Sequence, residues 1–528
     1  MLPRGAGSKR VCTHRGCEED HELRQGDSEQ HDQRRAEAER DEPQRDQCQD
    51  AEDRGEPPRD ARSSPQPEDD RAVDHEREHR LAEAGIVQLA GDRGVRIGHS
   101  REQRVQEDEP LRWRRRHVDR IIRALRRLAL IFLPAALAVG LPAALAGSAG
   151  DPGITSDTIL LGGTVPLSGD EVAYAAVARG ANAYFQYVDD RGGVRGRKIR
   201  YLYLDDAYNP SETVRKTREL VEDDKVFAIF NSVGTEHALA VRPYLNQLGV
   251  PQLFVGSGLS ALALERRRYP WTMGYLPRFA GEGALYGRYV KRTRPKSRIA
   301  VLHEDSEYGQ DMFTGLRAGL GSLSSRITAV QTYQLSDSDL NAQIARLKAS
   351  HADTIMIFAL PTQTIQAYLA IHKLGWKPRI FVNSVSIDPF VMDVVQRNTS
   401  KRLVEGTISS QFLKDPTDPA LAKDPGVKLY KQILRRYLPG AKVKEVAHLY
   451  GMAAAYTMVD ALRRAGAQPT RASLLRAATH LDERANPFFV KGVTVRTGPN
   501  DYYPVERTRM LRFHAGRWRQ LGGLATVR

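Results

Sequence analysis

Cysteine is almost absent from this chain of 528 residues, and its three copies, Cys12, Cys17 and Cys48, all lie near the beginning. Cys12 and Cys17, in CTHRGC, have no second pair at the spacing of a zinc site, so we expect no metal there. Because no cysteine follows residue 48, the rest of the chain cannot form an internal disulfide. It therefore suits an oxidising compartment without depending on disulfides.

Lysine, aromatic and β-branched residues are scarce in the first 116 residues, which are rich in arginine, acidic residues, glutamine and proline. Such a composition cannot bury enough apolar surface to fold, so we expect residues 1–116 to be disordered. Methionine is also missing between Met1 and Met273. We interpret residues 1–116 as an extension upstream of the true translation start, which we expect near Val118.

Long hydrophobic runs are lacking except for LALIFLPAALAVGLPAALAGSAG at 128–150. Four arginines between residues 120 and 127 precede this run, and Ala-Leu-Ala at 144–146 has the pattern that a signal peptidase needs. We expect a signal peptide at 117–146, cleaved after Ala146, and a product in the periplasm. The alternative is a membrane anchor, which the two prolines and the glycine inside the run disfavour.

Basic residues exceed acidic ones, 79 against 65, for a formal net charge of +14. Beyond residue 150 the excess is larger, with about 52 Lys and Arg against about 35 Asp and Glu. This balance suits anionic ligands or a membrane surface and does not decide between them. We expect no nucleic-acid partner.

Strands and helices alternate from residue 154 onward, in units of about 30 residues that are typical of parallel sheets covered by helices on both faces. The alternation of strands and helices is interrupted near 271–278 and then resumes, which predicts an α/β protein with two doubly wound lobes in series. The predicted strands and the loops that follow them lie at 158–169, 199–206, 226–234, 251–258, 298–309, 354–362 and 379–386. Because open parallel sheets bind ligands beyond the carboxyl ends of their strands, we expect a site between the lobes.

The loops after these strands read PLSG, NSVGT, VGSG, EDSEYG, LPT and NSVS. Their hydroxyls and backbone amides suit hydrogen bonding to a small polar ligand more than covalent chemistry. HEDSE at His303 has Glu307 where a zinc HExxH needs its second histidine, and Ser257 lacks the GxSxG spacing of a nucleophile elbow. Asp205 and Asp206 are neighbours on a strand and therefore point to opposite faces. GEGALYG at 281–287 is only loosely similar to a dinucleotide fingerprint. We expect no enzyme, cofactor or metal.

The segments DDRGGVRGRKIRYLYLDDAYNPSETVRKTRELVEDDKVFAIF, KSRIAVLHEDSEYGQDMFTGLRAGL and LGWKPRIFVNSVS occur in this order. Together with the other segments beyond residue 154, they resemble the substrate-binding proteins of ABC transporters of the branched-chain amino-acid (Leu/Ile/Val-binding) family. The resemblance implies a type I periplasmic-binding fold, in which two lobes are joined by three crossovers and close over a ligand. It predicts lobe I at 151–275 and 405–486, and lobe II at 276–404 and 487–528.

The resemblance also implies a set of ligand-binding residues on the loops that face each other across the lobes. They are Ser168, Tyr174, Gly234, Thr235, Gly256, Ser257, Gly258 and Tyr450 in lobe I, and Arg278, Tyr308, Pro361, Asn383 and Ser384 in lobe II. The loop with Ser168 and Tyr174 matches the family's first ligand loop, and the resemblance implies that Tyr174 covers the ligand. The loops at 234–235 and 256–258 match the two whose amides and hydroxyls hold a carboxylate in the amino-acid binders.

One departure from the family pattern concerns the ligand's ammonium group. Amino-acid-binding members have acidic residues after the first crossover and after the strand of the WKP segment, where this chain has Arg278 and the stretch Ser384 to Ser386. Asp388 is the nearest acid, two residues beyond Ser386. Burying an ammonium without a carboxylate costs several kcal/mol, so acids and amides without an amine deserve equal weight with leucine-like ligands.

The sequence thus predicts a periplasmic, non-catalytic receptor that captures a small carboxylate-bearing solute and delivers it to the permease subunits of an ABC importer. The ligand is predicted to be a branched-chain amino acid or a related aliphatic or aromatic acid or amide. One alternative is a ligand sensor of the same fold that regulates a signalling partner. Another, which the missing catalytic constellations disfavour, is a periplasmic enzyme.

Overall fold

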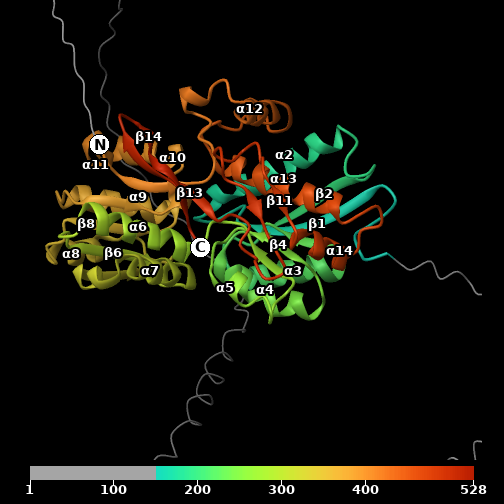
Figure 1. Ribbon diagram of the computed structural model, residues 1–528, viewed down its shortest axis with the longest axis horizontal. Helices are drawn as coiled ribbons and strands as arrows, with labels where there is room; N and C mark the ends of the chain where they lie inside the picture. Colours follow the sequence, from blue (N-terminus) through green and yellow to red (C-terminus); the bar gives the residue numbers. More distant parts are fainter. Residues whose placement is uncertain (1–149) are drawn as a thin grey trace, which may run out of the picture. The chain divides into compact units, whose positions relative to one another are not determined.

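The computed structural model describes residues 150–528 (Figure 1). The predicted disordered segment at 1–116 and the predicted signal peptide at 117–146 lie outside these residues. Within 150–528, no helix is long and apolar enough to cross a membrane.

Lobe I is built on a sheet of five parallel strands in the order β2-β1-β3-β4-β5. The strands are β1 (Thr158–Val165), β2 (Lys198–Asp205), β3 (Ala228–Phe230), β4 (Gln252–Val255) and β5 (Thr272–Gly274). Apolar side chains of α2 (Ala175–Asp189) and α13 (Ala447–Arg464) form the larger core against the sheet. A second cluster, with side chains of α4 (Thr235–Gln247) and the segment after α3 (Pro210–Arg218), forms a separate core against the same strands.

Lobe II is built on a sheet of seven strands in the order β14-β13-β10-β9-β8-β6-β7. Five are parallel: β6 (Ile299–Glu304), β7 (Ile327–Tyr333), β8 (Thr354–Phe358), β9 (Arg379–Val382) and β10 (Ile408–Gln411). The last two, β13 (Arg507–His514) and β14 (Arg517–Thr526), are antiparallel. One apolar core includes α6 (Phe279–Thr293) and α7 (Glu307–Leu320), and the other includes α8 (Asn341–Ala349), α9 (Pro361–Lys373) and α10 (Pro389–Asn398).

The two lobes therefore have the predicted doubly wound architecture, and their elements form two neighbouring groups in Figure 1. The strand runs TIMIF and IAVLHE are fully buried, as expected for parallel strands covered on both faces. In lobe II the C-terminal hairpin of β13 and β14 adds two antiparallel strands to the five parallel ones.

The remaining elements are short or cover the edges of the lobes. They are η1 (Val172–Tyr174), η2 (Glu219–Asp223), α5 (Ala261–Leu264), η3 (Gly321–Arg326), η4 (Ser384–Ser386), α11 (Lys401–Val404), η5 (Pro419–Leu421), α12 (Pro425–Tyr437), α14 (Arg471–Ala478), β11 (Asp482–Glu483) and β12 (Val495–Arg496).

The second and third crossovers lie later in the chain than the sequence predicted. β10 pairs with β9 and β13, so the chain stays in lobe II until Gln411 instead of leaving it at 405. Phe488, Phe489 and Val495 pack in the lobe I core, so the final return to lobe II follows residue 505 instead of 486. We therefore place lobe I at 151–275 and 412–505, and lobe II at 276–411 and 506–528.

The segment GEGALYG lies inside α6 and packs against α7. A Cβ on Gly283 would overlap the carbonyl oxygen of Met312, and one on Gly287 would crowd Leu316. The glycines let the backbones of α6 and α7 approach closely. Helix packing therefore explains the glycine spacing that is loosely similar to a dinucleotide fingerprint.

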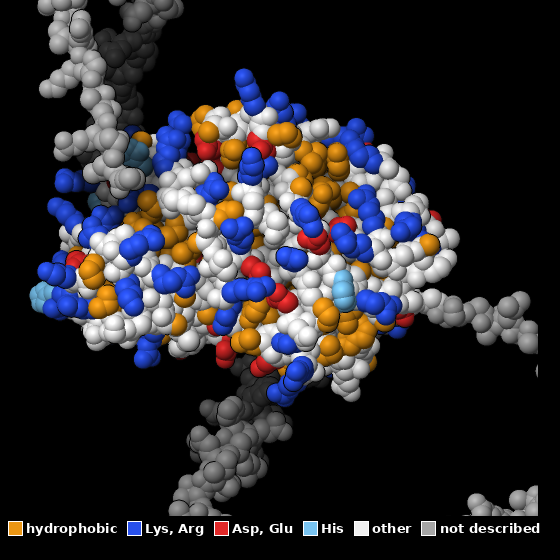
Figure 2. All heavy atoms as spheres, in the orientation of Figure 1, with side chains coloured by type: hydrophobic (Ala, Val, Ile, Leu, Met, Phe, Trp, Pro, Cys, Tyr) orange, Lys and Arg blue, Asp and Glu red, His pale blue; other side chains and the backbone are white. Residues whose placement is uncertain are grey.

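Basic side chains are spread over the surface of the described residues. Figure 2 shows Lys and Arg side chains across the visible face and few acidic ones between them. This agrees with the excess of basic residues beyond residue 150.

Candidate functional site

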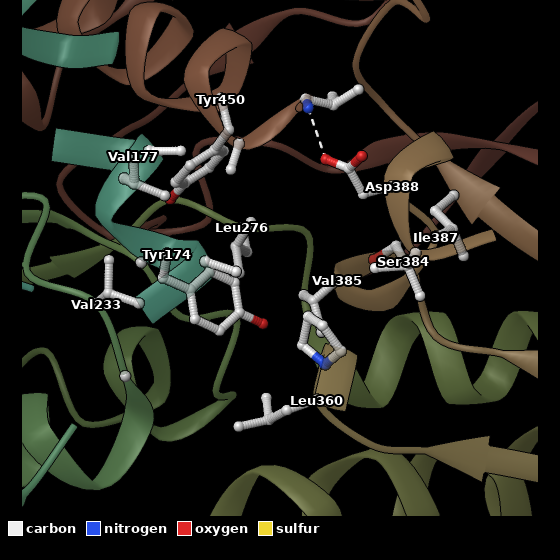
Figure 3. Close-up of a pocket in the computed structure, with 18 of the residues that line it drawn as sticks. Tyr174, Val177, Val233, Leu276, Leu360, Ser384, Val385, Ile387, Asp388 and Tyr450 are labelled. Carbon is white, nitrogen blue, oxygen red and sulfur yellow. Dashed lines mark hydrogen bonds between the residues drawn. The ribbon is translucent and has the colours of Figure 1, made fainter. Parts of the chain in front are cut away.

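A cavity of about 400 Å³ lies between the two lobes (Figure 3). Lobe I contributes η1, the start of α2, the loops after β3 and β4, and the start of α13. Lobe II contributes the loops after β6, β8 and β9. These loops lie at the carboxyl ends of parallel strands, where both sheets meet the interlobe space.

Eight of the thirteen predicted site residues line this cavity. They are Tyr174, Gly234, Thr235, Gly256, Tyr308, Pro361, Ser384 and Tyr450. The structure thus brings together residues that are up to 276 positions apart in the chain, from Tyr174 to Tyr450.

Ser168, Ser257 and Gly258 do not line the cavity and have other contacts. The hydroxyl of Ser168 donates to Asp205 Oδ2 at 2.6 Å, which ties the first loop to the end of β2. Ser257 Oγ lies 2.8 Å from Thr235 Oγ1, so it supports a lining residue from behind. Gly258 packs against the first crossover, where a Cβ would overlap the carbonyl oxygen of Pro277.

Arg278 and Asn383 also lie outside the cavity wall. Arg278 Nε donates to Ser260 Oγ at 2.7 Å, and the guanidinium lies over the ring of Tyr503. Asn383 is buried, and its Oδ1 accepts from the backbone N–H of Ala359 at 3.1 Å. Arg278 was predicted as a ligand-binding residue, but its side chain is held outside the cavity lining by these contacts.

The lobe I wall includes the amino end of α4. Gly234 is the residue before this helix and has a φ of 115°, which favours glycine; a Cβ there would also overlap the ring of His237. The next residue, Thr235, presents its hydroxyl together with Ser257. Unsatisfied N–H groups and the positive end of the helix dipole make such an end suitable for an anion.

Apolar side chains from both lobes form most of the wall. Figure 3 shows Tyr174, Val177, Val233 and Leu276 facing Leu360, Val385 and Ile387 across the cavity. Tyr450 accepts a hydrogen bond from Asn231 Nδ2 at 3.2 Å, which fixes its ring at the edge of the apolar region.

Four acidic residues, Glu236, Glu304, Asp388 and Glu445, line the cavity, so the premise that no acid is available for an ammonium is wrong. Burial raises the pKa of Asp388 to about 7, although Asp388 Oδ1 caps α10 and Oδ2 accepts from Val446 N–H at 2.6 Å. Burial and the charge of Glu236 raise the pKa of Glu304, which ends β6, to about 7. Glu304 is the first residue of EDSEYG, a loop that was expected from the sequence to lie at the site, although Glu304 itself was not predicted to bind the ligand.

Ser384 is held in place by a buried carboxyl of α6. Glu282 Oε1 accepts from the backbone N–H of Ser384, and Glu282 Oε2 accepts from its hydroxyl, both at 2.7 Å. Tyr286 also donates to Glu282, and burial raises the pKa of this carboxyl. The family position for an acid on this loop is thus filled by a serine with an acid behind it.

Hydrogen bonds join the lobes around the cavity. The bond from Val446 N–H to Asp388 is one, and Thr362 Oγ1 donates to the carbonyl oxygen of Asp170 at 3.3 Å. Glu307 N–H donates to Glu236 Oε1 at 2.9 Å. The described arrangement is therefore a closed one in which both lobes contact each other beside the cavity.

Glu171 lies beside the cavity, immediately before η1, and is 3% exposed. Within residues 150–528, neither of its carboxyl oxygens has a hydrogen-bond partner. Burial and the nearby Glu304 carboxyl raise the pKa of Glu171 to about 8. The carboxyl is therefore protonated at neutral pH in this arrangement.

We expect Glu171→Gln to stabilise the protein at pH 8 but not at pH 4. Between the usual glutamate pKa and about 8, the unfolded chain ionises Glu171 while the folded protein keeps it protonated, so stability is lost as the pH rises. Glutamine removes this loss, a gain on the order of 4 kcal/mol at pH 8. Denaturant unfolding at both pH values measures it, with exposed Asp305→Asn as the control. An equal effect at both pH values contradicts the prediction.

Among the described residues, no group of three or more His, Cys, Asp or Glu side chains could hold a metal ion. The cavity offers hydroxyls, backbone amides, carboxyls and a large apolar surface. Such an arrangement can hold and orient a small organic molecule.

Comparisons with known proteins agree with this geometry. The sequence profile of the family described as "Periplasmic binding protein" matches residues 158–510. An amino acid binding protein of Pseudomonas aeruginosa is 23% identical over 297 residues, which are 56% of this chain and 75% of that protein. A Leu/Ile/Val-binding protein homolog of Brucella abortus is 23% identical over 334 residues, 62% of this chain and 83% of that protein.

Solved structures share the fold at lower identity. A branched chain amino acid ABC transporter protein of Thermus thermophilus with bound valine gives a TM-score of 0.61 at 20% identity, covering 70% of this chain and 96% of that one. A solute binding protein of R. palustris in complex with 4-hydroxybenzoate gives 0.59 at 17% identity, covering 70% and 97%. Since the family profile spans both lobes and the fold is the type I fold of such receptors, the chain belongs to the periplasmic binding protein family.

Proposed function

We propose that this protein is the periplasmic solute receptor of an ABC importer, exported by the signal peptide at 117–146. It captures a small carboxylate-bearing solute with an apolar body between its lobes and delivers it to the membrane permease subunits. The observation that carries the proposal is the interlobe cavity of about 400 Å³, with the amino end of α4 on one wall and apolar side chains around the rest.

The carboxylate is expected to bind at Gly234 and Thr235. The backbone N–H groups at the start of α4 and the Thr235 hydroxyl are donors, and the helix dipole favours a negative charge at this end. Gly256, on the neighbouring loop, lets the backbone approach the same place without a side chain.

The apolar body of the solute is expected to contact Val177, Val233, Leu276, Leu360 and Val385. The cavity volume is within the range of small-molecule sites. The relatives bound to valine and to 4-hydroxybenzoate contain solutes that combine a carboxylate with an apolar group, which supports the same class here.

Solute binding is expected to stabilise the closed arrangement. The chain passes between the lobes near 275–278, 411–412 and 505–506, and these three crossovers suit a hinge. A solute that contacts both lobes binds the closed state more tightly than the open one and shifts the equilibrium toward it. Each lobe is then placed to contact one permease subunit.

A thermal-shift screen of the purified protein tests the solute class. It uses branched-chain amino acids, short fatty acids, aromatic acids and their amides. At saturating concentration, at least one carboxylate-bearing compound should raise the Tm by several degrees, because a bound ligand stabilises the folded state. The matching amide should have a smaller effect. Stabilisation by amides alone, or by none of these compounds, contradicts the proposal.

A further inference from the structure

A groove of about 530 Å³ lies on lobe II between α6 and the hairpin of β13 and β14. One face of α6 lines it with side chains three or four residues apart, namely Leu285, Arg288, Tyr289 and Arg292. The hairpin contributes Met510, Ala525, Thr526 and Arg528. Among the described residues, none that lines this groove also lines the interlobe cavity, so the groove is a separate place on the molecule.

Tyr289 joins the groove to a further arginine on β13. Arg512 Nη2 donates to the hydroxyl of Tyr289 at 3.4 Å. The guanidinium of Arg292 lies over the ring of the same tyrosine, 6.0 Å from its centre. Two guanidinium groups from different elements therefore approach one tyrosine at the wall of the groove.

The neighbouring strands bring Arg379 to the same face of the sheet as Arg512. Ile408 of β10 pairs with Phe381 of β9 on one side and with Arg512 of β13 on the other. Arg379 lies two residues before Phe381 on β9, so its side chain points to the same face as those of Phe381 and Arg512. Tyr289 packs on Phe381 at this face, with 6.0 Å between the ring centres. Both arginines therefore lie on the side of the sheet that α6 covers.

The arginines around the groove have few acidic partners. Within residues 150–528, no carboxylate forms an ion pair with Arg288, Arg292, Arg294, Arg379 or Arg512. Arg528 is the exception, since it pairs with Asp501 and Glu506. No Asp or Glu of the described chain lines the groove itself. The groove therefore carries an uncompensated positive charge.

Arg379 is the most constrained of these cations. Its Nε is buried, and none of the described residues accepts a hydrogen bond from it. Burial and the charges of Arg294 and Arg512 lower the pKa of Arg379, so this guanidinium is partly dehydrated and close to like charges. Buried donors normally have acceptors, so an unpartnered donor beside a basic groove indicates a place for an anion.

The chemistry of the groove favours a phosphate group over a carboxylate. All of its cations are arginines, whose planar forks match the oxygens of a phosphate in bidentate hydrogen bonds. A phosphate group presents several strong acceptor oxygens, so it can bind more than one guanidinium at once and reduce the repulsion between them. Leu285 and Met510 add apolar surface beside the arginines, which suits the uncharged remainder of a phosphate ester.

We propose that this groove binds a phosphate group, with the guanidinium groups of Arg292, Arg379 and Arg512 as donors. The phosphate belongs either to a soluble phosphate ester or to the headgroup of an anionic phospholipid. Arg379 begins β9, and Arg512 lies opposite Ile408, the first residue of β10. The site is therefore near the amino ends of these strands, whereas the interlobe cavity is at the carboxyl ends, and a bound phosphate leaves the cavity accessible.

Binding of phosphate-bearing probes to the purified protein tests the inference and separates the two sources. Titration calorimetry uses inorganic phosphate and glycerol 3-phosphate in about 50 mM NaCl, where exposed charges are only moderately screened. Sedimentation uses vesicles of phosphatidylcholine, with and without phosphatidylglycerol. Saturable binding of a soluble probe, with a Kd of about 1 mM or below, supports a soluble ester. Binding to the anionic vesicles alone supports a phospholipid headgroup. Binding to neither overturns the inference.

The variants Arg379→Gln and Arg512→Gln should each weaken this binding by at least about 10-fold, because each removes a charged donor of the phosphate. Arg267→Gln removes the same charge from an exposed position of lobe I and should weaken binding by less than about 2-fold. Arg512 is exposed, so its variant stays folded, and thermal unfolding checks all three. An equal loss in Arg267→Gln means that the overall charge of the protein binds the probe, and it overturns the inference. Undiminished binding in both groove variants does the same.

Discussion

Replacing Val385 with arginine should lower the affinity for solute by at least about 1,000-fold, which is about 4 kcal/mol, while the protein stays folded. Val385 lies on η4 of lobe II and faces Tyr174 of lobe I across the cavity (Figure 3). The longer side chain occupies the space of the solute. Its charge is tolerated, because the same wall contains the carboxyls of Glu304 and Asp388.

Val385→Ala is the matched control for this experiment. It removes apolar contact without adding volume or charge, so we expect a loss of affinity below about 10-fold. Calorimetry with the tightest solute from the screen measures both variants, and thermal unfolding checks that both are folded. If Val385→Arg retains affinity within 10-fold of the natural protein, the cavity between the lobes is not the binding site.

The position of the site could be predicted because it follows from the direction of the strands. The loop NSVGT follows a parallel strand of the lobe I sheet, and the loops EDSEYG and LPT follow parallel strands of the lobe II sheet, so each loop lies at the carboxyl edge of its own sheet. Thr235, Tyr308 and Pro361 line the cavity for this reason. The strand direction predicts at which end of each sheet the site lies, but it does not predict where each side chain points.

The direction of the Arg278 side chain and the positions of the second and third crossovers could not be predicted from the sequence pattern. Arg278 lies at the start of α6, where its side chain turns toward Ser260, and no periodicity predicts that turn. β10 is the short polar stretch ISSQ, which has too few apolar residues to be recognised as a strand. Its pairing with β13 depends on a partner about 100 residues later in the chain.

The buried acids Glu171 and Glu304 were not identified from the sequence for a related reason. Glu171 and Glu304 lie in different lobes, and their closeness depends on how the lobes close. Glu304 carried one signal that could have identified it, since it is the last residue of a strand whose following loop was already expected to face the site. Its burial, and so its altered ionisation, can be known only from the fold.

Packing between α2 and α13 positions two tyrosines of the cavity wall. Tyr174 directly precedes α2, and Tyr450 lies in the first turn of α13. Each helix has a glycine at the contact: a Cβ on Gly180 would overlap the carbonyl oxygen of His448, and one on Gly451 would overlap that of Val177. The helices therefore cross backbone to backbone, and Val177 and Tyr450 both line the cavity.

Gly451→Leu should destabilise the protein by at least about 3 kcal/mol. Only the protein that stays folded can then bind solute, so the amount of binding-competent protein falls with the folded fraction. Leucine has a higher helix propensity than glycine, by about 1 kcal/mol, so the loss must come from the forced separation of α13 from α2. Gly523→Leu, on the exposed strand β14 with no neighbour within contact distance, should change stability by less than about 0.5 kcal/mol. Denaturant unfolding measures both variants. Equal stability of the two would mean that the close crossing of α2 and α13 does not hold the tyrosines in place.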